Sequence, residues 1–305
     1  MVEAFYAPEP VIEKTKITRA DIKKIFFETL NDFAIDSNWV ELKSSKIIND
    51  STLIYSVKIP QDLPLLLVVN DLTKNYRYNN IESTSDEKKI NGATLFKVVV
   101  DDEERLNAKL VHSSNSERQE SKAAFIVEDA YELSERNLKR LLDFGYPFSV
   151  ILTPSLESEL FKDKITVAGK DYVLILNDEI DDDKFIMEEG FAKKKIAAAV
   201  SSILSSFPDS KMFFVDEDSD LYQSAIFNFI EDEFGKRSIR LRLKSEFKSL
   251  NGISSEETKS LFDFYKNKND IPKTFFITSQ NFLPLREDLI KFRKRGNIIA
   301  KISDL

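Results

Sequence analysis

The chain of 305 residues has no cysteine, one histidine and only 7 glycines. The absence of cysteine excludes disulfide bridges, thiolate zinc centres and cysteine nucleophiles. Neither a GxGxxG dinucleotide loop nor a phosphate-binding GxxxxGK[ST] loop is present, and GxSxG is missing too. The single histidine is His112, so the later part of the chain, residues 123–305, contains no histidine that could activate a serine. We interpret His112 as a partly exposed residue at a strand end.

Long apolar runs are also missing, since none approaches the roughly 20 residues of a membrane-spanning helix. The net charge of −8 argues against a concentrated basic face for nucleic acid. Residues 1–14 lack the features of a signal peptide and form a Pro/Glu-rich extended lead-in. This is either a cytoplasmic N-terminus or a stalk left after a signal or anchor was removed. In the second case we expect a periplasmic or cell-envelope protein, whose only membrane contact was that anchor.

The first part of the chain predicts a small α+β domain over residues 15–112. Thr18 and Asp21 form a plausible capping box at the start of a helix. An α-β-β unit is expected twice, as helices over 18–34 and 61–76 and strands near 38–43, 52–59, 93–100 and 106–112. The polar, aperiodic stretch 113–122 predicts a linker, although a long surface loop inside one domain is the alternative.

Apolar runs and amphipathic segments alternate through residues 123–305. Strands are expected at 123–127, 148–152, 172–176, 212–215, 238–243, 274–277 and 297–302. Helices are expected between them, including 134–144, 188–206, 219–234, 255–267 and 284–295. This alternation is typical of parallel strands joined by right-handed crossovers. It predicts a seven-stranded parallel β/α barrel, with an open doubly wound sheet as the alternative, and a functional face at the strands' carboxyl ends.

Polar residues follow each predicted strand. They are Glu128 and Asp129, Thr153, Asn177 to Glu179, Asp216 to Asp218, Lys244, Thr278 to Gln280 and Ser303. Acidic groups from several strands suit a carboxylate metal site or an acid/base pair. Solvated carboxylates at strand ends are the ordinary alternative. The predicted binding residues are Glu128, Asp129, Glu179 and Asp216. The run Asp181–Asp183 lacks the ligand spacing of an EF-hand and predicts a solvated loop.

The stretch AAFIVEDAYELSERNLKRLLDFGYPFSVILTPSLE, from Ala123, resembles the start of the divergent polysaccharide deacetylase family, relatives of the NodB-type carbohydrate esterases. That family begins its barrel with an apolar strand ending in two aspartates, then a helix, then a strand ending in proline, here Pro154. The similarity continues at GKDYVLILNDE, FPDSKMFFVDEDSD and LREDLIKFRKRGNIIAKIS and covers roughly 123–303. The resemblance implies a barrel of the deacetylase type.

The resemblance also implies site positions that this chain does not fill. Asp129 falls at the metal-ligand aspartate and Glu128 at the catalytic-base aspartate. The histidine of the third strand corresponds to Ile175, and the late histidine-proline segment corresponds to Ser279–Phe282. The family's asparagine- and histidine-containing segment is missing between Gly190 and Phe213. Without imidazole ligands a zinc site is not expected. A weak carboxylate site for Mg²⁺ or Ca²⁺, through Asp129 if any, is the remaining possibility.

Three functional hypotheses follow. The first is a non-catalytic deacetylase-like protein, with no cofactor, that binds a protein partner or a glycan in the cell envelope. In this hypothesis Glu128 and Asp129 are vestigial. The second is a hydrolase of glycans that uses a carboxylate-bound metal. The third is a cytoplasmic structural protein without a ligand. Nucleic acid is not expected as a partner in any of them.

Overall fold

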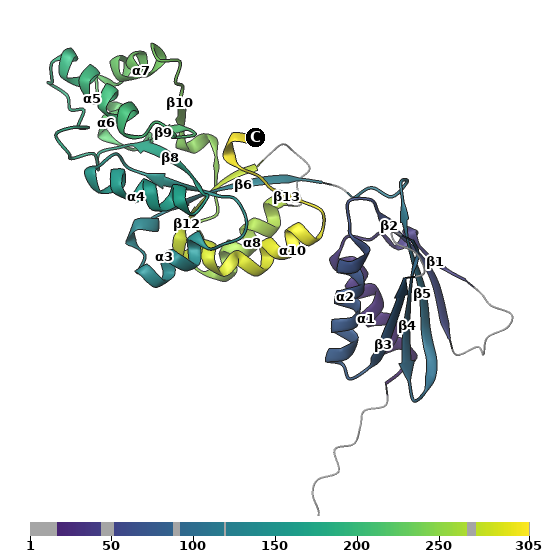
Figure 1. Cartoon of the computed structure of the whole chain (residues 1–305). Coiled ribbons are helices and arrows are strands. Elements are labelled where there is room, and N and C mark those ends of the chain that lie inside the picture. Colours follow the sequence, from purple (N-terminus) through teal and green to yellow (C-terminus); the bar gives the residue numbers. More distant parts are fainter. Residues whose placement is uncertain (1–16, 44–51, 88–91, 119, 267–272, 305) are drawn as a thin grey trace, which may run out of the picture. The chain divides into compact units, whose positions relative to one another are not determined.

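The computed structural model describes residues 17–43, 52–87, 92–118, 120–266 and 273–304 (Figure 1). The predicted lead-in over 1–14 lies outside them. The chain divides into two compact units, Met1–Arg118 and Gln119–Leu305. Within the described ranges every helix is too short or too polar to span a lipid bilayer.

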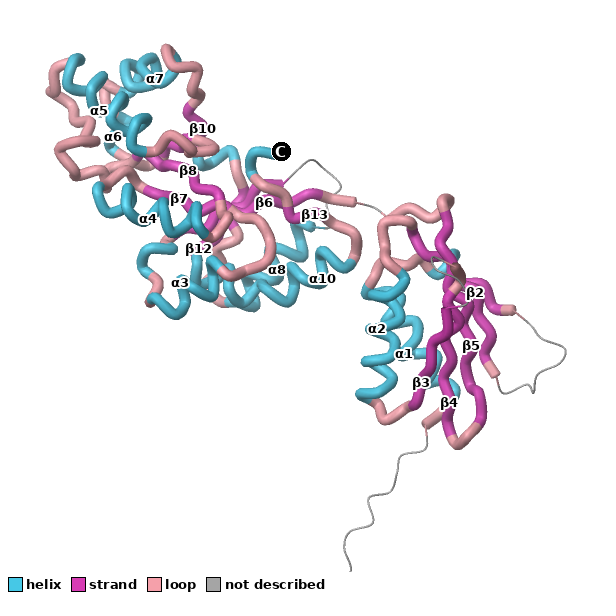
Figure 2. The backbone as a smooth tube through the Cα atoms, in the orientation of Figure 1, coloured by secondary structure: helices cyan, strands magenta, loops and turns pink. Residues whose placement is uncertain are grey.

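The first unit is a five-stranded sheet with two helices on one face (Figure 2). The strands are β1 (Val40–Leu42), β2 (Leu53–Pro60), β3 (Glu82–Glu87), β4 (Thr94–Val100) and β5 (Glu103–Ser113), and the helices are α1 (Arg19–Asp32) and α2 (Leu65–Tyr78). Their order in the sheet is β1-β2-β5-β4-β3, with β2 and β5 parallel and the other pairs antiparallel. The predicted α-β-β unit thus occurs twice, with β3 added.

The local sequence explains where several helices and strands of the first unit begin or end. Thr18 and Asp21 form the expected capping box at the start of α1. Asp101 and Asp102 both have positive φ, the conformation of a two-residue hairpin turn between β4 and β5. Strand β3 was not expected because ESTSDE has no apolar alternation, and its exposed side chains suit an edge of the sheet. The predicted strand 38–43 is shortened, since Ser37–Trp39 forms a 3₁₀ turn.

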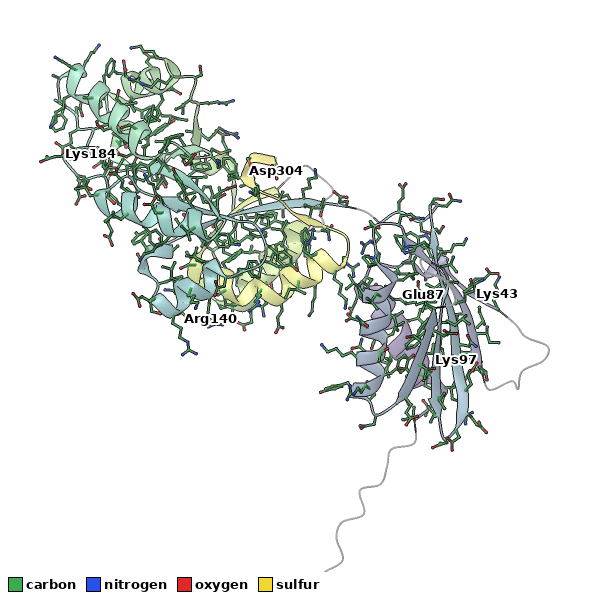
Figure 3. All side chains as sticks on the ribbon, viewed as in Figure 1. Lys43, Glu87, Lys97, Arg140, Lys184 and Asp304 are labelled. Atoms are coloured by element: carbon green, nitrogen blue, oxygen red, sulfur yellow. The ribbon has the colours of Figure 1, made fainter. Side chains whose placement is uncertain are left out.

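The helices cover only one face of this sheet. Tyr76 of α2 is buried there and its hydroxyl donates to the carbonyl of Ile22 at 2.7 Å, which joins α2 to α1. On the opposite face, Lys97 of β4 pairs with Glu104 of β5 at 2.6 Å (Figure 3). Buried Phe96 and Val98 flank Lys97 in sequence and point toward the helices. The unit is therefore a two-layer α/β sandwich with one open sheet face.

The predicted linker, residues 113–122, connects the two units, and several of its residues belong to a strand or make contacts within one of the units. Its first residue, Ser113, ends β5, and its last, Lys122, begins the first strand of the second unit. Arg118 pairs with Asp62 and donates to the carbonyl of Phe33 at 3.1 Å. On the other side, Ser121 donates from its backbone to Asn297 at 3.1 Å.

The second unit contains one sheet of parallel strands with helices between them. The strands are β6 (Lys122–Glu128), β7 (Ser149–Leu152), β8 (Asp171–Leu176), β9 (Phe213–Val215), β10 (Leu241–Leu243), β11 (Lys248–Ser249), β12 (Lys273–Thr278) and β13 (Ile298–Ile299). The longer helices are α3 (Glu135–Leu142), α4 (Leu156–Val167), α5 (Lys193–Ser206), α7 (Phe227–Gly235), α8 (Ser255–Lys266) and α10 (Arg286–Lys294). The short ones are α6 (Asp220–Gln223) and α9 (Ser279–Phe282). The strand order is β10-β9-β8-β7-β6-β12-β11, and β13 also pairs with β6.

The distance between two phenylalanine rings shows that this sheet is curved. Strands β9 and β12 are separated in the strand order by β8, β7 and β6. With about 4.8 Å between neighbouring strands, a flat sheet would hold them about 19 Å apart. The ring centroids of Phe214 in β9 and Phe276 in β12 lie 5.2 Å apart instead. The sheet therefore curls around its inner face as a barrel.

A single segment, residues 241–250, carries both edges of the curled sheet. Its beginning, β10, pairs with β9, and its end, β11, pairs with β12. Between them Phe247 contacts both inner phenylalanines, with centroids 5.1 Å from Phe214 and 5.9 Å from Phe276. The inner cluster is small and apolar and is completed by Ile126, Ile151, Val173, Ile175 and Ile302. The barrel interior is thus a packed core.

The predicted parallel β/α barrel behind a small α+β domain is confirmed. Four details differ from the sequence prediction. The β11 strand was not expected, because two residues within a polar stretch give no signal. The predicted strand 297–302 is only Ile298–Ile299, and a 3₁₀ turn follows. The predicted helix 219–234 is divided into α6 and α7, and the one over 188–206 begins at Lys193.

Candidate functional site at the strand ends

The carboxyl ends of the parallel strands bring together residues that are far apart in sequence. Glu128 is the last residue of β6, Lys244 follows β10 and Asn251 follows β11. Asp129 leaves β6 with φ of 55°, in the left-handed region that aspartate tolerates better than most residues. This turn separates the side chains of two adjacent carboxylates, which consequently have different surroundings.

Glu128 has two partners within the chain. One carboxylate oxygen lies 2.7 Å from the Lys244 ammonium, and the other accepts a 2.8 Å hydrogen bond from the Asn251 amide. The Glu128 side chain is 12% exposed and that of Lys244 is 34% exposed. The Lys244 ammonium also lies 5.6 Å from the ring centroid of Phe276, at the top of the barrel interior. We call Glu128, Lys244 and Asn251 the paired side of the site.

The charge of Lys244 is stabilised at this position. Burial of its ammonium disfavours the charged form and is the largest single effect. The hydrogen bond and charge of Glu128, with the charges of Asp216 and Asp129, together outweigh burial and raise the pKa of Lys244 above its usual value. Lys244 is therefore a permanent cation at neutral pH.

Asn251 is itself fixed from the far side. Its side-chain oxygen accepts the backbone N–H of Thr278 at 2.7 Å, so its amide nitrogen faces Glu128. Gly252 follows it in a crowded turn, where an added Cβ would lie 2.7 Å from the backbone nitrogen of Thr258. Glycine is therefore needed for the close approach that positions Asn251.

Asp129 has acidic neighbours. Burial is the largest cause that raises the pKa of its carboxyl, and Glu128 and Glu132 raise it further. Lys244 offsets part of this rise, and Glu179 adds to it. Among the described residues, no side chain or backbone group hydrogen-bonds to the Asp129 carboxylate. We call Asp129, Glu132 and Glu179 the acidic side of the site.

The other predicted site residues lie around these two sides. Glu179 accepts a hydrogen bond from Thr153 at 3.2 Å. Asp216 accepts the backbone N–H of Asp218 at 3.1 Å and contributes to the field that stabilises Lys244. Glu128, Asp129, Glu179 and Asp216 thus share one electrostatic environment. Within the described ranges, no three His, Cys, Asp or Glu side chains are arranged to hold a metal ion.

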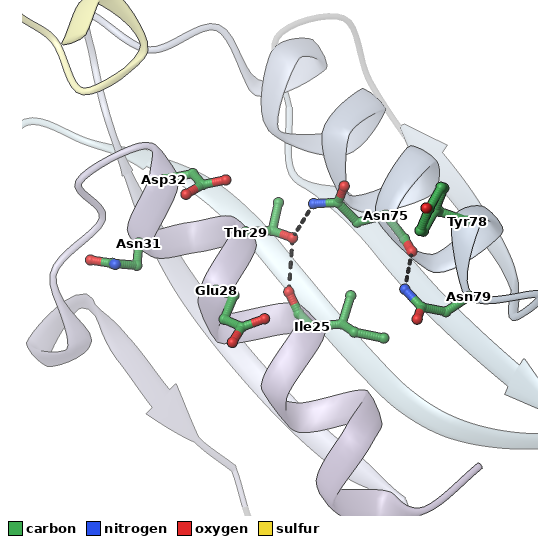
Figure 4. A pocket seen from close by; sticks show the side chains of 8 residues that line it. All are labelled: Ile25, Glu28, Thr29, Asn31, Asp32, Asn75, Tyr78 and Asn79. Carbon is green, nitrogen blue, oxygen red and sulfur yellow. Dashed lines mark hydrogen bonds between the residues drawn. The ribbon is translucent and has the colours of Figure 1, made fainter. Parts of the chain in front are cut away.

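Two cavities occur away from the Glu128 position. One, of ≈ 280 Å³, lies beside Asn177 and Asp178, and the Asp178 carboxylate accepts backbone hydrogen bonds from the start of α6 there. The other, of ≈ 420 Å³, is a polar groove between α1 and α2 in the first unit (Figure 4). There the Asn75 amide donates to the Thr29 hydroxyl at 2.8 Å. Neither cavity is lined by any of the four predicted binding residues.

Sequence reasoning identified Lys244 as a strand-end residue without assigning it a partner, and it missed Asn251. The two-residue β11 gave no signal that Asn251 would follow a strand. His112 is half-buried at the end of β5, and its ring nitrogen Nδ1 lies 3.2 Å from the carbonyl of Pro60. Its place at the end of a strand is as expected from the sequence. The loop Asp181–Asp183 has a capping role, since Asp182 accepts the backbone N–H of Leu156.

Comparison with known proteins gives neighbours among the solved structures only. No protein-family model and no curated protein matches this chain. A family 4 carbohydrate esterase from Streptomyces lividans, solved with acetate, matches with a TM-score of 0.39 and 7% identity over 61% of this chain and 93% of its own. The wild-type pseudoenzyme BA3943 of that family, from Bacillus anthracis, matches with a TM-score of 0.42 and 10% identity over 74% of this chain and 89% of its own. A mutant of BA3943 with restored enzymatic activity matches with a TM-score of 0.42 and 10% identity over 74% of this chain and 92% of its own.

The neighbours of this structure are thus family 4 carbohydrate esterases, and one of them is a pseudoenzyme. The low TM-scores and identities give no argument for the activity of this chain. Its chemistry therefore has to be inferred from the residues at its own strand ends.

Proposed function

We propose that this protein is a non-catalytic, deacetylase-like protein that acts as a binding or assembly component of the cell envelope. The observation that carries the proposal is the ion pair between Lys244 and Glu128. In the family that the sequence resembles, the position of Glu128 belongs to the base that acts on a metal-bound water. Here that carboxylate already bonds an ammonium group and an amide within its own chain.

A divalent ion beside this pair would meet three obstacles. The Lys244 ammonium would repel it. No histidine follows His112 to supply an imidazole ligand. The described carboxylates do not form a group of three that could surround it. Without a firmly held ion, the pKa of a water molecule would stay too high for Glu128 to deprotonate it.

We infer that binding, rather than chemistry, takes place at the strand ends. On the acidic side the Asp129 carboxylate has no hydrogen-bond partner among the described residues and Glu179 has only the Thr153 hydroxyl, so a neutral or cationic surface suits this side better than a phosphate-rich one. A glycan or a protein partner satisfies this condition, whereas nucleic acid does not. The predicted contact residues are Glu128, Asp129, Glu179 and Asp216.

The experiment tests metal content and turnover together. We expect the purified chain, stripped with chelator and incubated with Zn²⁺, to retain no stoichiometric zinc by mass spectrometry. We also expect no acetate release from acetylated chitooligosaccharides or peptidoglycan fragments. An identically purified Asp129→Ala variant is the control for contaminating esterase. Acetate release by the wild type that this variant lacks would overturn the proposal.

The runner-up function is a glycan hydrolase with a carboxylate-bound metal. The observation that favours it is the Asp129 carboxylate, for which the described residues provide no hydrogen-bond partner. The same assays, repeated with Mg²⁺ and Ca²⁺, distinguish the two functions. Stoichiometric metal that Asp129→Ala loses, together with turnover, would support the hydrolase. Calorimetric binding of chitooligosaccharides without turnover would support the non-catalytic glycan-binding form.

A further inference from the structure

Helix α4, on the outside of the barrel, exposes an apolar stripe. Its side chains of Leu156, Leu160 and Val167 are 54%, 74% and 90% exposed. They are spaced by four and seven residues, which places them on one side of a helix. Ser158 and Ile165 lie on the opposite side and are buried against the barrel. The stripe is therefore the solvent face of a helix that already has its own buried face.

Contacts at its first turn and along its length hold helix α4 against the rest of the second unit. Ser155 and Ser158 form a capping box at its first turn. Glu159 forms an ion pair with Lys184 at 2.8 Å (Figure 3). The Lys162 ammonium donates a hydrogen bond to the carbonyl of Ser206. The exposed leucines therefore cannot fold back into the barrel core without breaking these contacts.

Charges beside the stripe are arranged to complement a second copy of the same helix. Glu157 and Lys164 are both exposed, lie seven residues apart on one flank of the stripe and make no ion pair with any described residue. Seven residues correspond to two turns, or about 10.5 Å along the axis. In an antiparallel pair about a two-fold axis near Leu160, Glu157 of each copy meets Lys164 of the other. The same axis places the two Leu160 side chains near each other and brings Leu156 to within two residues of Val167, or about 3 Å along the helix.

The charges on the other flank of the stripe are less favourable for pairing with a second copy of the helix. It carries Asp163 and Glu159, which would face each other across the same axis. Glu159 is already neutralised by Lys184, so one uncompensated charge per copy remains. Two apolar stripes of three residues and two ion pairs form a small interface, in the range of weak, concentration-dependent association.

We propose that α4 forms a weak symmetric dimer with α4 of a second copy of this chain. The proposal does not depend on the proposed function, because it uses no residue at the strand ends. Sedimentation equilibrium of the full chain at about 5 to 500 µM should show a monomer–dimer equilibrium. High salt should shift it toward the monomer, because it screens the Glu157–Lys164 pairs.

Charge exchange tests the arrangement. Glu157→Lys and Lys164→Glu should each weaken association about tenfold, because each places like charges opposite one another twice. The double variant Glu157→Lys/Lys164→Glu should restore the wild-type constant. Leu160→Lys should abolish association, whereas Ile253→Lys, at a 99% exposed residue outside α4, should leave it unchanged. Circular dichroism should show unchanged folding in every variant.

Three results would overturn the proposal. One is a wild type that stays monomeric over the whole range, which would mean that the stripe is bare or is covered by another part of the same chain. Another is a dimer that Leu160→Lys does not affect, which would place the interface elsewhere. The third is a double variant that associates no better than the single ones, which would exclude the antiparallel pairing.

Discussion

The paired side and the acidic side of the strand-end site differ although Glu128 and Asp129 are neighbours in sequence. Glu128 receives an ammonium group from the segment that carries both edge strands and an amide from Asn251, which directly follows that segment. Asp129, turned away by its left-handed backbone, has Glu132 and Glu179 among the groups that raise its pKa. The comparison teaches that the tertiary partner, and not the residue type, decides whether a strand-end carboxylate stabilises the fold.

The largest expected effect comes from breaking the paired side. Lys244→Met removes the cation and leaves Glu128, which is 12% exposed, with only the Asn251 amide. We expect the free energy of unfolding at pH 7 to fall by about 2 kcal/mol, less than for a fully buried pair because the ammonium is partly exposed. Urea denaturation measures it.

The matched control is Lys259→Met, whose 3.9 Å pair with Asp288 lies at the surface. It should change the unfolding free energy by less than about 0.5 kcal/mol. Equal losses in the two lysine variants would show that the paired side contributes no more than an ordinary surface contact.

A smaller effect is expected from Asn251→Ala. The substitution removes one hydrogen bond to Glu128 and one to the backbone of Thr278, while the ion pair with Lys244 remains. We expect a loss of about 1 kcal/mol in denaturant melts. Asn115→Ala, in an exposed turn of the first unit, serves as the control and should be close to neutral. A neutral Asn251→Ala would mean that the amide does not support Glu128.

The smallest effect, with the opposite sign, is expected on the acidic side. The raised pKa of Asp129 means that its ionisation disfavours the native state. Asp129→Asn should therefore stabilise the protein at pH 7, by about 0.5 kcal/mol for a partly exposed group. Asparagine also tolerates the left-handed backbone.

The pH dependence of this variant gives a sharper test. A carboxyl with a raised pKa contributes stability below its unfolded pKa, and loses it as pH rises through the folded pKa. The advantage of Asp129→Asn should thus be constant near pH 7 and shrink as pH falls toward about 4. Chelator is present throughout the melts. Because the chelator removes loosely bound metal, marked destabilisation at pH 7 would show that the Asp129 carboxylate makes a structural contact.

The sequence predicted those parts of the fold that depend on local patterns of apolar residues, and it did not predict those that depend on contacts between distant segments. Apolar runs such as that of Ala123–Val127 indicate strands because burial on both faces requires them. The curvature that brings Phe214 to Phe276 is a property of the whole sheet, and no local pattern predicts it. Strand β3 was missed because an exposed edge strand needs no apolar side chains.

The site was predictable only as a set of strand-end positions. The parallel strands imply that Glu128, Asp129, Glu179 and Asp216 lie at one end of the sheet. The partners of Glu128 could not be identified, because Asn251 lies 123 residues away and follows a strand of two residues. Lys244 was visible, but its pairing depends on how residues 241–250 bend from β9 to β12.

That bend links the closing of the barrel to the neutralisation of Glu128. Residues 241–250 form the seam where the curled sheet meets itself, and Lys244 lies within it while Asn251 directly follows it. The Lys244 ammonium reaches Glu128 because residues 241–250 run from β9 to β12 past the end of β6. Separating this segment from the sheet would remove the ion pair together with the contacts of Phe247 to Phe214 and Phe276. The salt bridge between Lys244 and Glu128 therefore fastens the segment that closes the barrel to β6, so the ion pair at the strand ends is also a contact that holds the barrel closed.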